Sequence, residues 1–343
     1  MENLIRKDLH GFKGYSSARK EAQETKINLN ANESPWSNGL NRYPDQQPQA
    51  LVKQLAGYFS VAEDSLLVTR GSDEGIDCLM RLFCQAGQDS IVICPPTFGM
   101  YRIAAQLQGA EVIEAPLQVD DYELDRETVL AACKENSKLI FLCSPNNPTG
   151  NTVALVDIQY LCEKRQGQSM IIVDEAYIDF ADIDSAISLL QQYDNLVILR
   201  TFSKAFGLAA ARVGVLLGQR SLIDWLKTIL APYPIPAASA KAVLERLQTA
   251  PLQTVNECIQ ATIAERESLI KELNKLEIAQ KVWPSQANFV LVQFSLPVFD
   301  RCQQQGILLR DMSQRLGLDN VVRISVGTPE ENKALLTLLR GMA

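Results

Sequence analysis

Residues that can do chemistry gather in three short segments, each directly after an apolar run. The segments are 144–150 (SPNNPTG), 174–177 (DEAY) and 201–204 (TFSK), and Arg212 follows eight residues after the last of them. In open α/β sheets, ligands bind outside the carboxyl ends of the strands, where a strand does not itself need polar residues. We therefore expect the three segments to converge on one crevice.

The residue types in these segments suit the handling of a carbonyl compound and a phosphate. The Lys204 amine can act as a nucleophile towards a carbonyl group, and the Asp174 carboxylate can pair with a cation. Arg212, together with hydroxyl groups and the amides at a helix start, can hold a phosphate. Each segment alone also has a plainer interpretation: NNPTG is a good turn, Asp174 could cap a helix, and Lys204 could be a solvated lysine.

Other familiar catalytic machinery lacks its residues in this chain. His10 is the single histidine and lies in a polar N-terminal segment. A Ser-His-Asp triad, a histidine-rich metal site and a histidine general base are therefore disfavoured, and no metal is expected. Neither GxGxxG after a strand nor GxxxxGK[ST] occurs, so dinucleotide and P-loop sites lose their main support.

Short apolar runs define the elements that must position these residues. We expect strands at 66–69, 91–94, 138–143, 170–173, 196–199 and 212–218. A helix is expected after Gly71, with apolar residues at 76, 79, 80 and 83 on one face. The runs are continuous rather than alternating, as in a parallel sheet covered by helices on both faces. Spacings of about 25–30 residues leave room for crossover helices.

The chain is expected to have three parts: an N-terminal arm at 1–40, a large α/β domain at 41–235 and a small C-terminal domain at 236–343. The boundary follows from APYPIP at 231–236, because closely spaced prolines end a helix and are excluded from a central strand. After it we expect a helical region at 237–277, strands at 288–294 and 321–326, and a final helix over the last dozen residues.

Composition excludes several classes of partner. The 343 residues include 33 Lys+Arg and 40 Asp+Glu, a formal net charge of −7, which disfavours nucleic acid and anionic membranes as partners. No apolar run is long enough to cross a membrane, and residues 1–20 lack the apolar stretch of a secretion signal. The eight cysteines form no CxxC pair, so we expect reduced, mostly buried thiols and a cytoplasmic location.

Together and in this order, the three segments resemble the fold-type I pyridoxal-phosphate (PLP) enzymes, the class I/II aminotransferases. The resemblance implies PLP as cofactor and the three-layer α/β fold of PLP-dependent transferases, with a mostly parallel sheet in the large domain and a smaller C-terminal α/β domain. Lys204 would carry the cofactor as an aldimine, and Asp174 would pair with the pyridinium nitrogen. The resemblance assigns the other cofactor contacts to Asn147 and Tyr177 at the ring 3-oxygen and to Thr201, Ser203 and Arg212 at the phosphate.

Two earlier segments also resemble parts of this cofactor site. Gly71, Ser72 and Asp73 correspond to the backbone cradle of the phosphate, which requires the carboxylates of Asp73 and Glu74 to point outward. Phe98 corresponds to the aromatic residue that stacks on the cofactor ring. The alternatives are a plain turn capped by Ser72 and a core position for Phe98.

The histidinol-phosphate branch of this family is similar to the chain in six further segments: 28–33 (NLNANE), 42–45 (RYPD), 94–101 (CPPTFGMY), 231–234 (APYP), 309–311 (LRD) and 322–328 (VRISVGT). This similarity implies the conversion of histidinol phosphate and 2-oxoglutarate into imidazole-acetol phosphate and glutamate, a step of histidine biosynthesis. Threonine-phosphate decarboxylase and aromatic amino acid aminotransferase, which share the fold and cofactor, remain alternatives, as does a PLP-binding regulator without enzymatic activity.

The same branch implies residues for the substrate and for a second subunit. Arg323 would bind an amino acid carboxylate, as a planar guanidinium does well. Arg310 would meet the substrate phosphate with Tyr15 of the arm, and Asn32 is also assigned to the substrate. Tyr43 resembles the tyrosine that reaches the cofactor phosphate of the neighbouring subunit, which implies a homodimer with shared sites.

Overall fold

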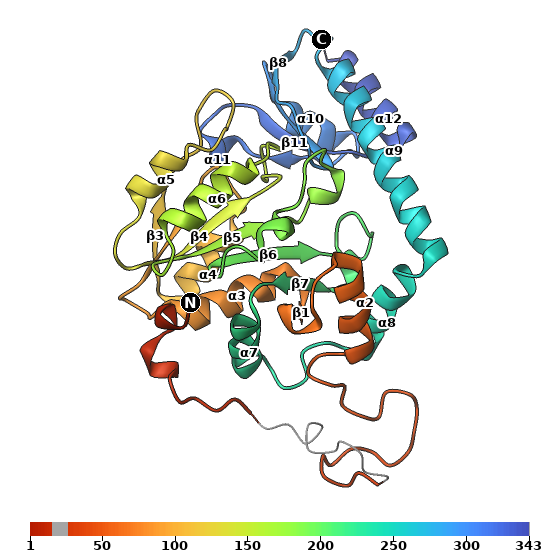
Figure 1. Ribbon diagram of the computed structural model, residues 1–343. Coiled ribbons are helices and arrows are strands. Elements are labelled where there is room, and N and C mark those ends of the chain that lie inside the picture. Colours follow the sequence, from red (N-terminus) through yellow and green to blue (C-terminus); the bar gives the residue numbers. More distant parts are fainter. Residues whose placement is uncertain (16–26, 343) are drawn as a thin grey trace.

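A seven-stranded sheet forms the centre of the computed structural model, which describes residues 1–15 and 27–342 (Figure 1). Across the sheet the strand order is β1-β7-β6-β5-β4-β2-β3. The strand β7 is antiparallel to both of its neighbours, β1 and β6, and all other neighbouring pairs are parallel, so the sheet is mostly parallel, as expected. The strands are β1 (Leu66–Thr69), β2 (Ser90–Ile93), β3 (Glu111–Glu114), β4 (Ser137–Cys143), β5 (Met170–Asp174), β6 (Leu196–Thr201) and β7 (Gly214–Leu217).

Helices cover both faces of this sheet and bury its strands. Ile171 and Val173 of β5 belong to one apolar cluster, and Ile172 between them belongs to another, because alternate side chains leave a strand on opposite faces. The first cluster includes α2 (Gln49–Phe59) and α6 (Leu155–Lys164), whereas the second includes α3 (Gly71–Phe83), α4 (Met100–Gln108) and α7 (Arg220–Ile229). The result is the three-layer α/β arrangement predicted from the continuous apolar runs, with α5 (Arg126–Ala132) beside α6.

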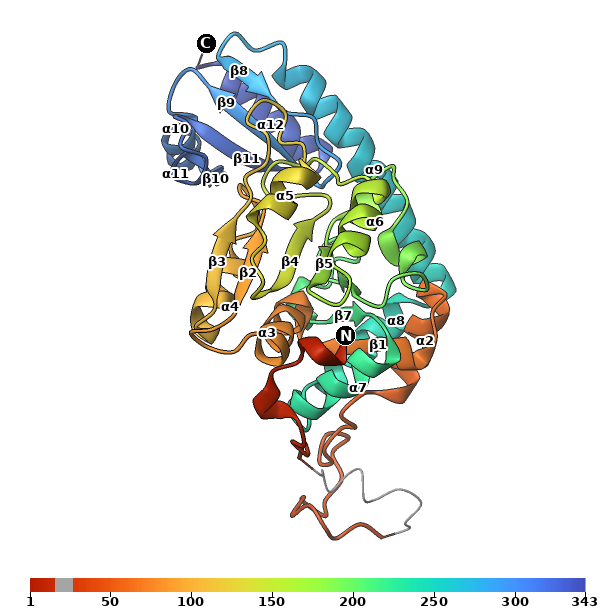
Figure 2. The same cartoon turned by 60° about the vertical axis from the view of Figure 1, so that its left-hand side comes forward.

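A second, antiparallel sheet of four strands forms the C-terminal part, in the order β10-β11-β9-β8. Its strands are β8 (Ala279–Val282), β9 (Phe289–Phe294), β10 (Arg310–Asp311) and β11 (Val321–Ser325). The long helix α9 (Thr249–Leu273) runs along one side of the molecule from this part towards α8 (Ala237–Arg246), which packs on α2 (Figure 2). The remaining helices are α10 (Val298–Gln304), α11 (Ser313–Leu316) and α12 (Pro329–Arg340).

The N-terminal segment differs from the single polar arm expected at 1–40. Residues 1–10 lie against the large sheet domain, and the side chains of Leu4 and Ile5 join the core formed with α3 and α7. The segment 27–48 has no helix or strand and extends away from the body of the molecule (Figure 1). It exposes several large apolar side chains: Ile27, Leu29, Trp36, Leu40 and Tyr43.

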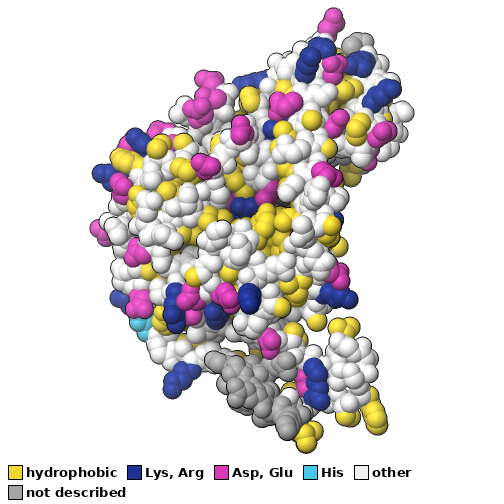
Figure 3. All heavy atoms as spheres, turned by 45° about the vertical axis from the view of Figure 1, so that its right-hand side comes forward, with side chains coloured by type: hydrophobic (Ala, Val, Ile, Leu, Met, Phe, Trp, Pro, Cys, Tyr) yellow, Lys and Arg dark blue, Asp and Glu magenta, His cyan; other side chains and the backbone are white. Residues whose placement is uncertain are grey.

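One face of the molecule carries charges of both signs (Figure 3). Acidic and basic side chains are interspersed over the face in Figure 3, where the cyan side chain is the single histidine, His10. Among residues 1–15 and 27–342, no helix is both long and apolar enough to cross a membrane.

Candidate active site

The three polar segments meet in one pocket at the carboxyl edge of the large sheet. They follow β4, β5 and β6, which are adjacent in the sheet and parallel, so their carboxyl ends share an edge. The start of α3 and the segment before α4 complete the wall. The lining residues are Ser72, Asp73, Phe98, Cys143, Asp174, Ala176, Tyr177, Thr201, Ser203, Lys204 and Arg212.

Lys204 lies just beyond β6 and lines this pocket. Its Nζ is 5.6 Å from the centre of the Tyr177 ring. Burial lowers the pKa of the Lys204 amine, and the charges of Arg323 and Arg212 lower it further, against the opposing effect of Asp73 and Asp174. A larger fraction of the amine is therefore neutral at a given pH than for a solvated lysine, and a neutral amine can act as a nucleophile or accept a proton.

Asp174 ends β5 and is almost completely buried. One carboxylate oxygen, Oδ2, accepts a hydrogen bond of 2.8 Å from the Tyr101 hydroxyl, and Oδ1 accepts one of 3.1 Å from the backbone N–H of Ala176. Burial raises the pKa of the Asp174 carboxyl to about 6, although both hydrogen bonds favour its ionised form. Such a carboxylate would gain from a positive partner, which a protonated ring nitrogen would supply.

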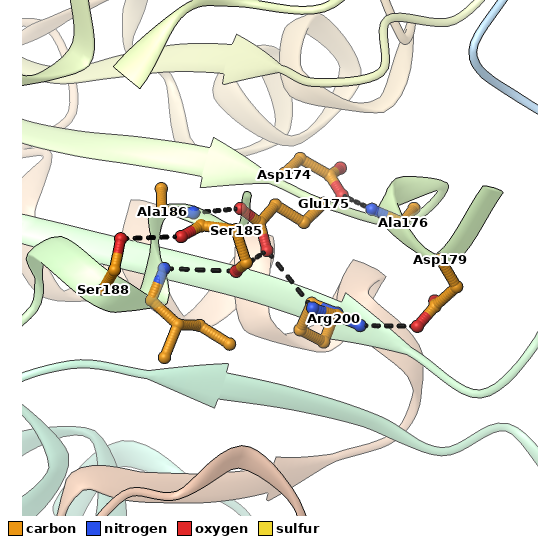
Figure 4. Close-up of polar contacts among 9 residues, drawn as sticks. Asp174, Glu175, Ala176, Asp179, Ser185, Ala186, Ser188 and Arg200 are labelled. Atoms are coloured by element: carbon orange, nitrogen blue, oxygen red, sulfur yellow. Dashed lines mark hydrogen bonds and ion pairs between the residues drawn. The ribbon is translucent and has the colours of Figure 1, made fainter. Parts of the chain in front are cut away.

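A second buried carboxylate holds the chain behind Asp174. Glu175 turns its side chain away from that of Asp174, towards Ser185 and Arg200 (Figure 4). It accepts hydrogen bonds from the Ser185 hydroxyl (2.6 Å) and the Ala186 N–H (2.7 Å), and Arg200 bridges it to Asp179. Glu175 therefore has partners of its own outside the pocket and fixes the end of β5 from the other side.

Asn147 and Tyr177 form a pair at one side of the pocket, as the sequence predicts for the ring 3-oxygen. The Asn147 amide nitrogen is 3.1 Å from the Tyr177 hydroxyl and donates to it. The Asn147 carbonyl oxygen accepts a hydrogen bond from Nη1 of Arg323. Arg323 therefore reaches the edge of the pocket from β11 of the small sheet.

Hydroxyl groups and one guanidinium gather at the opposite end. Thr201 Oγ1 and Ser203 Oγ are 3.0 Å apart, and Arg212 Nη1 donates to Ser203 Oγ at 3.3 Å. No side chain of the described residues caps the amides at the start of α3. Gly71 has φ +73°, and a Cβ there would lie 2.6 Å from Arg212 Nη2, so only glycine lets the guanidinium approach this turn. These donors fit a phosphate.

The carboxylates beside this turn only partly follow the expectation. Glu74 points away and binds Arg70, with its Oε2 accepting from the Arg70 N–H at 2.7 Å. Asp73, in contrast, lines the pocket and pairs with Arg212 at 3.1 Å. The prediction of two outward carboxylates is wrong for Asp73, because a guanidinium within reach attracts its side chain inward.

Phe98 lines the pocket beside the segment that starts α4. Its ring meets that of Tyr101 edge to face, with centroids 5.6 Å apart. The Phe98 ring therefore belongs to the pocket wall, where it can contact a planar ligand. Taken together, the lysine, the buried carboxylate, the amide-phenol pair and the phosphate donors fit PLP.

Seven predicted residues are not part of the pocket lining. Gly71, Asn147 and Arg323 are joined to it by the contacts described above, and the other four are Tyr15, Asn32, Tyr43 and Arg310. Tyr15, Asn32 and Tyr43 belong to the N-terminal segment; Tyr15 is 69% and Tyr43 48% exposed, and Tyr43 stacks on Tyr233 with ring centroids 4.4 Å apart. Arg310, on β10, lies directly opposite Arg323 on β11. The structure therefore brings Arg310 and Arg323 together but does not bring the three arm residues to the lysine.

Sequence reasoning missed Tyr101, Cys143 and Ala176. Cys143 and Ala176 line the pocket, and Tyr101 contacts Asp174 from behind its wall. Tyr101 stands three residues after Phe98, about one helical turn, and this spacing was the available signal.

Comparisons with known proteins identify the family. The model of the family "Aminotransferase class I and II" matches residues 15–339. A histidinol-phosphate aminotransferase of Francisella philomiragia is 44% identical over 345 residues, covering 100% of this chain and 96% of that protein.

Two solved structures have the same fold. A histidinol-phosphate aminotransferase from Sinorhizobium meliloti, solved with pyridoxal-5'-phosphate, has a TM-score of 0.80 at 22% identity and covers 95% of this chain and 87% of its own. An L-threonine-O-3-phosphate decarboxylase from Porphyromonas gingivalis has a TM-score of 0.74 at 23% identity, covering 88% and 91%. Because the family model matches nearly the whole length and a relative is 44% identical over the whole chain, this chain belongs to the class I and II aminotransferases.

Proposed function

We propose that this protein is a PLP-dependent aminotransferase that interconverts histidinol phosphate and 2-oxoglutarate with imidazole-acetol phosphate and glutamate, in histidine biosynthesis. Family membership and the whole-length identity of 44% to a histidinol-phosphate aminotransferase support the reaction class. The pairing of Arg310 with Arg323 across two strands carries the substrate assignment.

Bound PLP supplies an aldehyde that takes up the substrate amine and a ring that accepts the electron pair left when the Cα proton departs. Lys204 is the residue placed to take that proton, because its amine has a lowered pKa and lies in the pocket beside Tyr177. Asp174 would hold the ring nitrogen in its protonated form. Asn147 and Tyr177 would orient the ring through its 3-oxygen, and Arg212 with Thr201 and Ser203 would hold the cofactor phosphate.

The two arginines of the small sheet suit an anionic substrate. Residues directly opposite in an antiparallel pair share a face, and two like charges there are unfavourable unless an anion lies between them. Arg323 is largely buried, its Nε has no hydrogen-bond partner among the described residues, and burial lowers its pKa. A phosphate or carboxylate would give this guanidinium the missing acceptor.

Each half-reaction presents a different anion to these arginines. Glutamate carries an α-carboxylate, whereas histidinol phosphate carries none and offers a phosphate monoester instead. Arg323 therefore has to accept both groups in turn. Arg310, which is exposed on the short strand β10, would add the second charge that a phosphate near its dianionic form requires.

A homodimer would complete the site. A second subunit whose pocket receives segment 27–48 is supported by the exposed apolar side chains of this segment and by the position of Tyr43 outside the lining of its own pocket. Tyr15 and Asn32 would reach the substrate in the same way. A cytoplasmic location agrees with eight unpaired cysteines.

The reaction is tested by supplying the purified protein with PLP, histidinol phosphate and 2-oxoglutarate and identifying the products by mass spectrometry. Imidazole-acetol phosphate and glutamate in equal amounts are expected. Parallel reactions contain threonine phosphate, or phenylalanine or tyrosine with 2-oxoglutarate, in place of histidinol phosphate. Release of CO₂ from threonine phosphate without turnover of histidinol phosphate would indicate the decarboxylase. Turnover of phenylalanine or tyrosine with no use of histidinol phosphate would indicate an aromatic aminotransferase.

The phosphate assignment is tested by Arg310→Ala, with Arg301→Ala on α10 as a matched surface control. A charge-assisted hydrogen bond contributes about 1.5–3 kcal/mol, so kcat/KM for histidinol phosphate should fall at least roughly tenfold. Turnover of glutamate should fall much less, and the control should match the wild type. Equal losses on both substrates would contradict the role of Arg310 in phosphate specificity.

A further inference from the structure

We propose that Tyr101 is a positioning residue, which keeps Asp174 ionised and directed at the cofactor ring through a hydrogen bond from outside the pocket. The proposal rests on the proposed function, since it concerns the carboxylate that would hold the ring nitrogen. Tyr101 does not line the pocket, and its hydroxyl approaches Asp174 from within the protein core.

The two side chains contact each other directly, and both are buried. The Tyr101 hydroxyl lies 2.8 Å from Asp174 Oδ2, Tyr101 has no exposed surface, and Asp174 is 2% exposed. Because both side chains are buried, the phenol replaces part of the hydration that a charged carboxylate would have in water. A hydrogen bond to an ionised acceptor in such surroundings is stronger than one between neutral groups.

Packing fixes the phenol in this position. The Tyr101 ring stacks on Phe141 of β4 with centroids 4.7 Å apart and planes at 20°, and meets Phe98 edge to face. Tyr101 belongs to the first turn of α4, and Phe98 lies just before that helix. One segment therefore supplies both the ring at the pocket wall and the hydroxyl behind it, so a shift of α4 would move both.

The surroundings of Asp174 otherwise favour its protonated form, so the hydrogen bond from Tyr101 is one of few contacts that favour the ionised form. Burial raises the pKa of Asp174, and the nearby acidic groups Asp73 and Glu175 raise it further. Among the described residues, only the Tyr101 hydroxyl and the Ala176 N–H donate to the carboxylate. Besides Glu175, whose side chain points away but whose charge acts on Asp174, the titratable groups around this carboxylate are Asp73, Tyr101, Cys143, Tyr177 and Lys204.

The test is Tyr101→Phe, studied first in the protein freed of cofactor. Titration of ¹³C-labelled aspartate carboxyls by NMR, with Asp174→Asn to assign the signal, follows the ionisation of Asp174 directly. The pKa is about 6 with the phenol present, and loss of the hydroxyl should lower the ionisation constant of this carboxyl roughly tenfold. In the protein loaded with ¹⁵N-labelled PLP, the ring-nitrogen signal should move towards that of the unprotonated form.

Three controls separate this role from mere packing. Phe141→Leu removes the ring beneath Tyr101 but keeps its hydroxyl, so it should lower stability and leave the Asp174 titration unchanged. Tyr193→Phe removes another tyrosine hydroxyl that donates to a carboxylate, that of Glu163, and should also leave it unchanged. Replacing Tyr101 by 3-fluorotyrosine, whose phenol is a stronger donor, should move the pKa of Asp174 in the opposite direction.

An Asp174 titration that is the same in Tyr101→Phe and wild type would overturn the proposal, and so would a Phe141→Leu effect as large as that of Tyr101→Phe. If Tyr101→Phe does not fold, the fluorinated variant still tests the proposal, because an unchanged pKa of Asp174 in that variant would contradict it. The titration of the cofactor-free protein needs no substrate, so its outcome is independent of whether histidinol phosphate is turned over.

Discussion

Burial of the Asp174 carboxylate lowers the stability of the folded chain but places a negative charge where the cofactor ring would lie. Its pKa in the folded chain is about 6, whereas that of an unfolded aspartate is about 4. The folded chain therefore binds more protons between these pH values, so its stability falls as pH rises through that window and remains lower above it.

Asp174→Asn should consequently stabilise the cofactor-free protein above pH 6 and slow turnover strongly. The gain in free energy of unfolding is at most about 3 kcal/mol, because the folded and unfolded pKa values differ by about two units and each unit corresponds to about 1.4 kcal/mol. Urea unfolding at pH 8 and pH 5 should show the gain at pH 8 and a smaller one at pH 5. Asp157→Asn, at a carboxylate paired with Arg126, should give no gain. Reduced stability of Asp174→Asn at pH 8 would contradict the cost assigned to this charge.

At the residue scale, the sequence predicts best those residues that end central strands. Asp174 and Lys204 follow strands β5 and β6, whose parallel register places their ends together. Tyr101 could not be predicted in the same way. A tyrosine that donates a hydrogen bond to a site carboxylate and a tyrosine that only packs in the core have the same sequence pattern. The inward turn of Asp73 depends on where Arg212 lies, 139 positions away in the chain.

At the element scale, the approach of β7 to the start of α3 shapes the phosphate end of the pocket. A Cβ on Gly214 would overlap the carbonyl carbon of Gly71 and the amide nitrogen of Ser72. Backbone atoms cannot move aside as a flexible side chain does, so any larger residue at 214 has to push the turn away from the strand.

Gly214→Ala should therefore weaken PLP binding at least roughly tenfold, a loss of about 1.4 kcal/mol, and should destabilise the chain. Fluorescence titration of the cofactor-free protein with PLP measures the change in affinity. Gly57→Ala is the matched control, since a Cβ there meets nothing within 4 Å in α2, and alanine favours a helix over glycine. Unchanged PLP affinity in Gly214→Ala would show that this contact does not shape the site.

Buried strands were predictable, including the buried edge strand β1, whereas the partly exposed edge strands β3 and β8 were not. The runs at 138–143 and 170–173 are continuous and apolar, and they became β4 and β5 nearly as expected. In contrast, β3 reads EVIE and is partly exposed at the sheet edge, and β8 reads AQKV at the edge of the small sheet. An edge strand of this kind exposes much of its surface, so its residues follow no clear apolar pattern.

At the scale of the whole molecule, Tyr43 tests whether two subunits share a site. We expect Lys204→Ala and Tyr43→Ala each to be poorly active alone. In a mixed dimer of the two variants, one pocket should contain an intact Lys204 and receive an intact Tyr43 from the other chain. About half of the wild-type activity per mixed dimer should return when differently tagged subunits are mixed and purified together.

No recovery in isolated mixed dimers would mean that Tyr43 acts within its own chain or not at all. Isolation of monomers would remove the basis for a shared site. The sequence resemblance predicted this arrangement, but physical reasoning from one chain could not, because the partner surface of segment 27–48 is not part of that chain.

The ion pair between Asp73 and Arg212 has a consequence for how the pocket receives its cofactor. Asp73 lies 3.1 Å from Arg212, and both side chains are about half exposed. A phosphate held by Arg212 would therefore share this guanidinium with an anion of the chain itself. The attraction gained would be the difference between two partners rather than the full attraction of a cation without a partner.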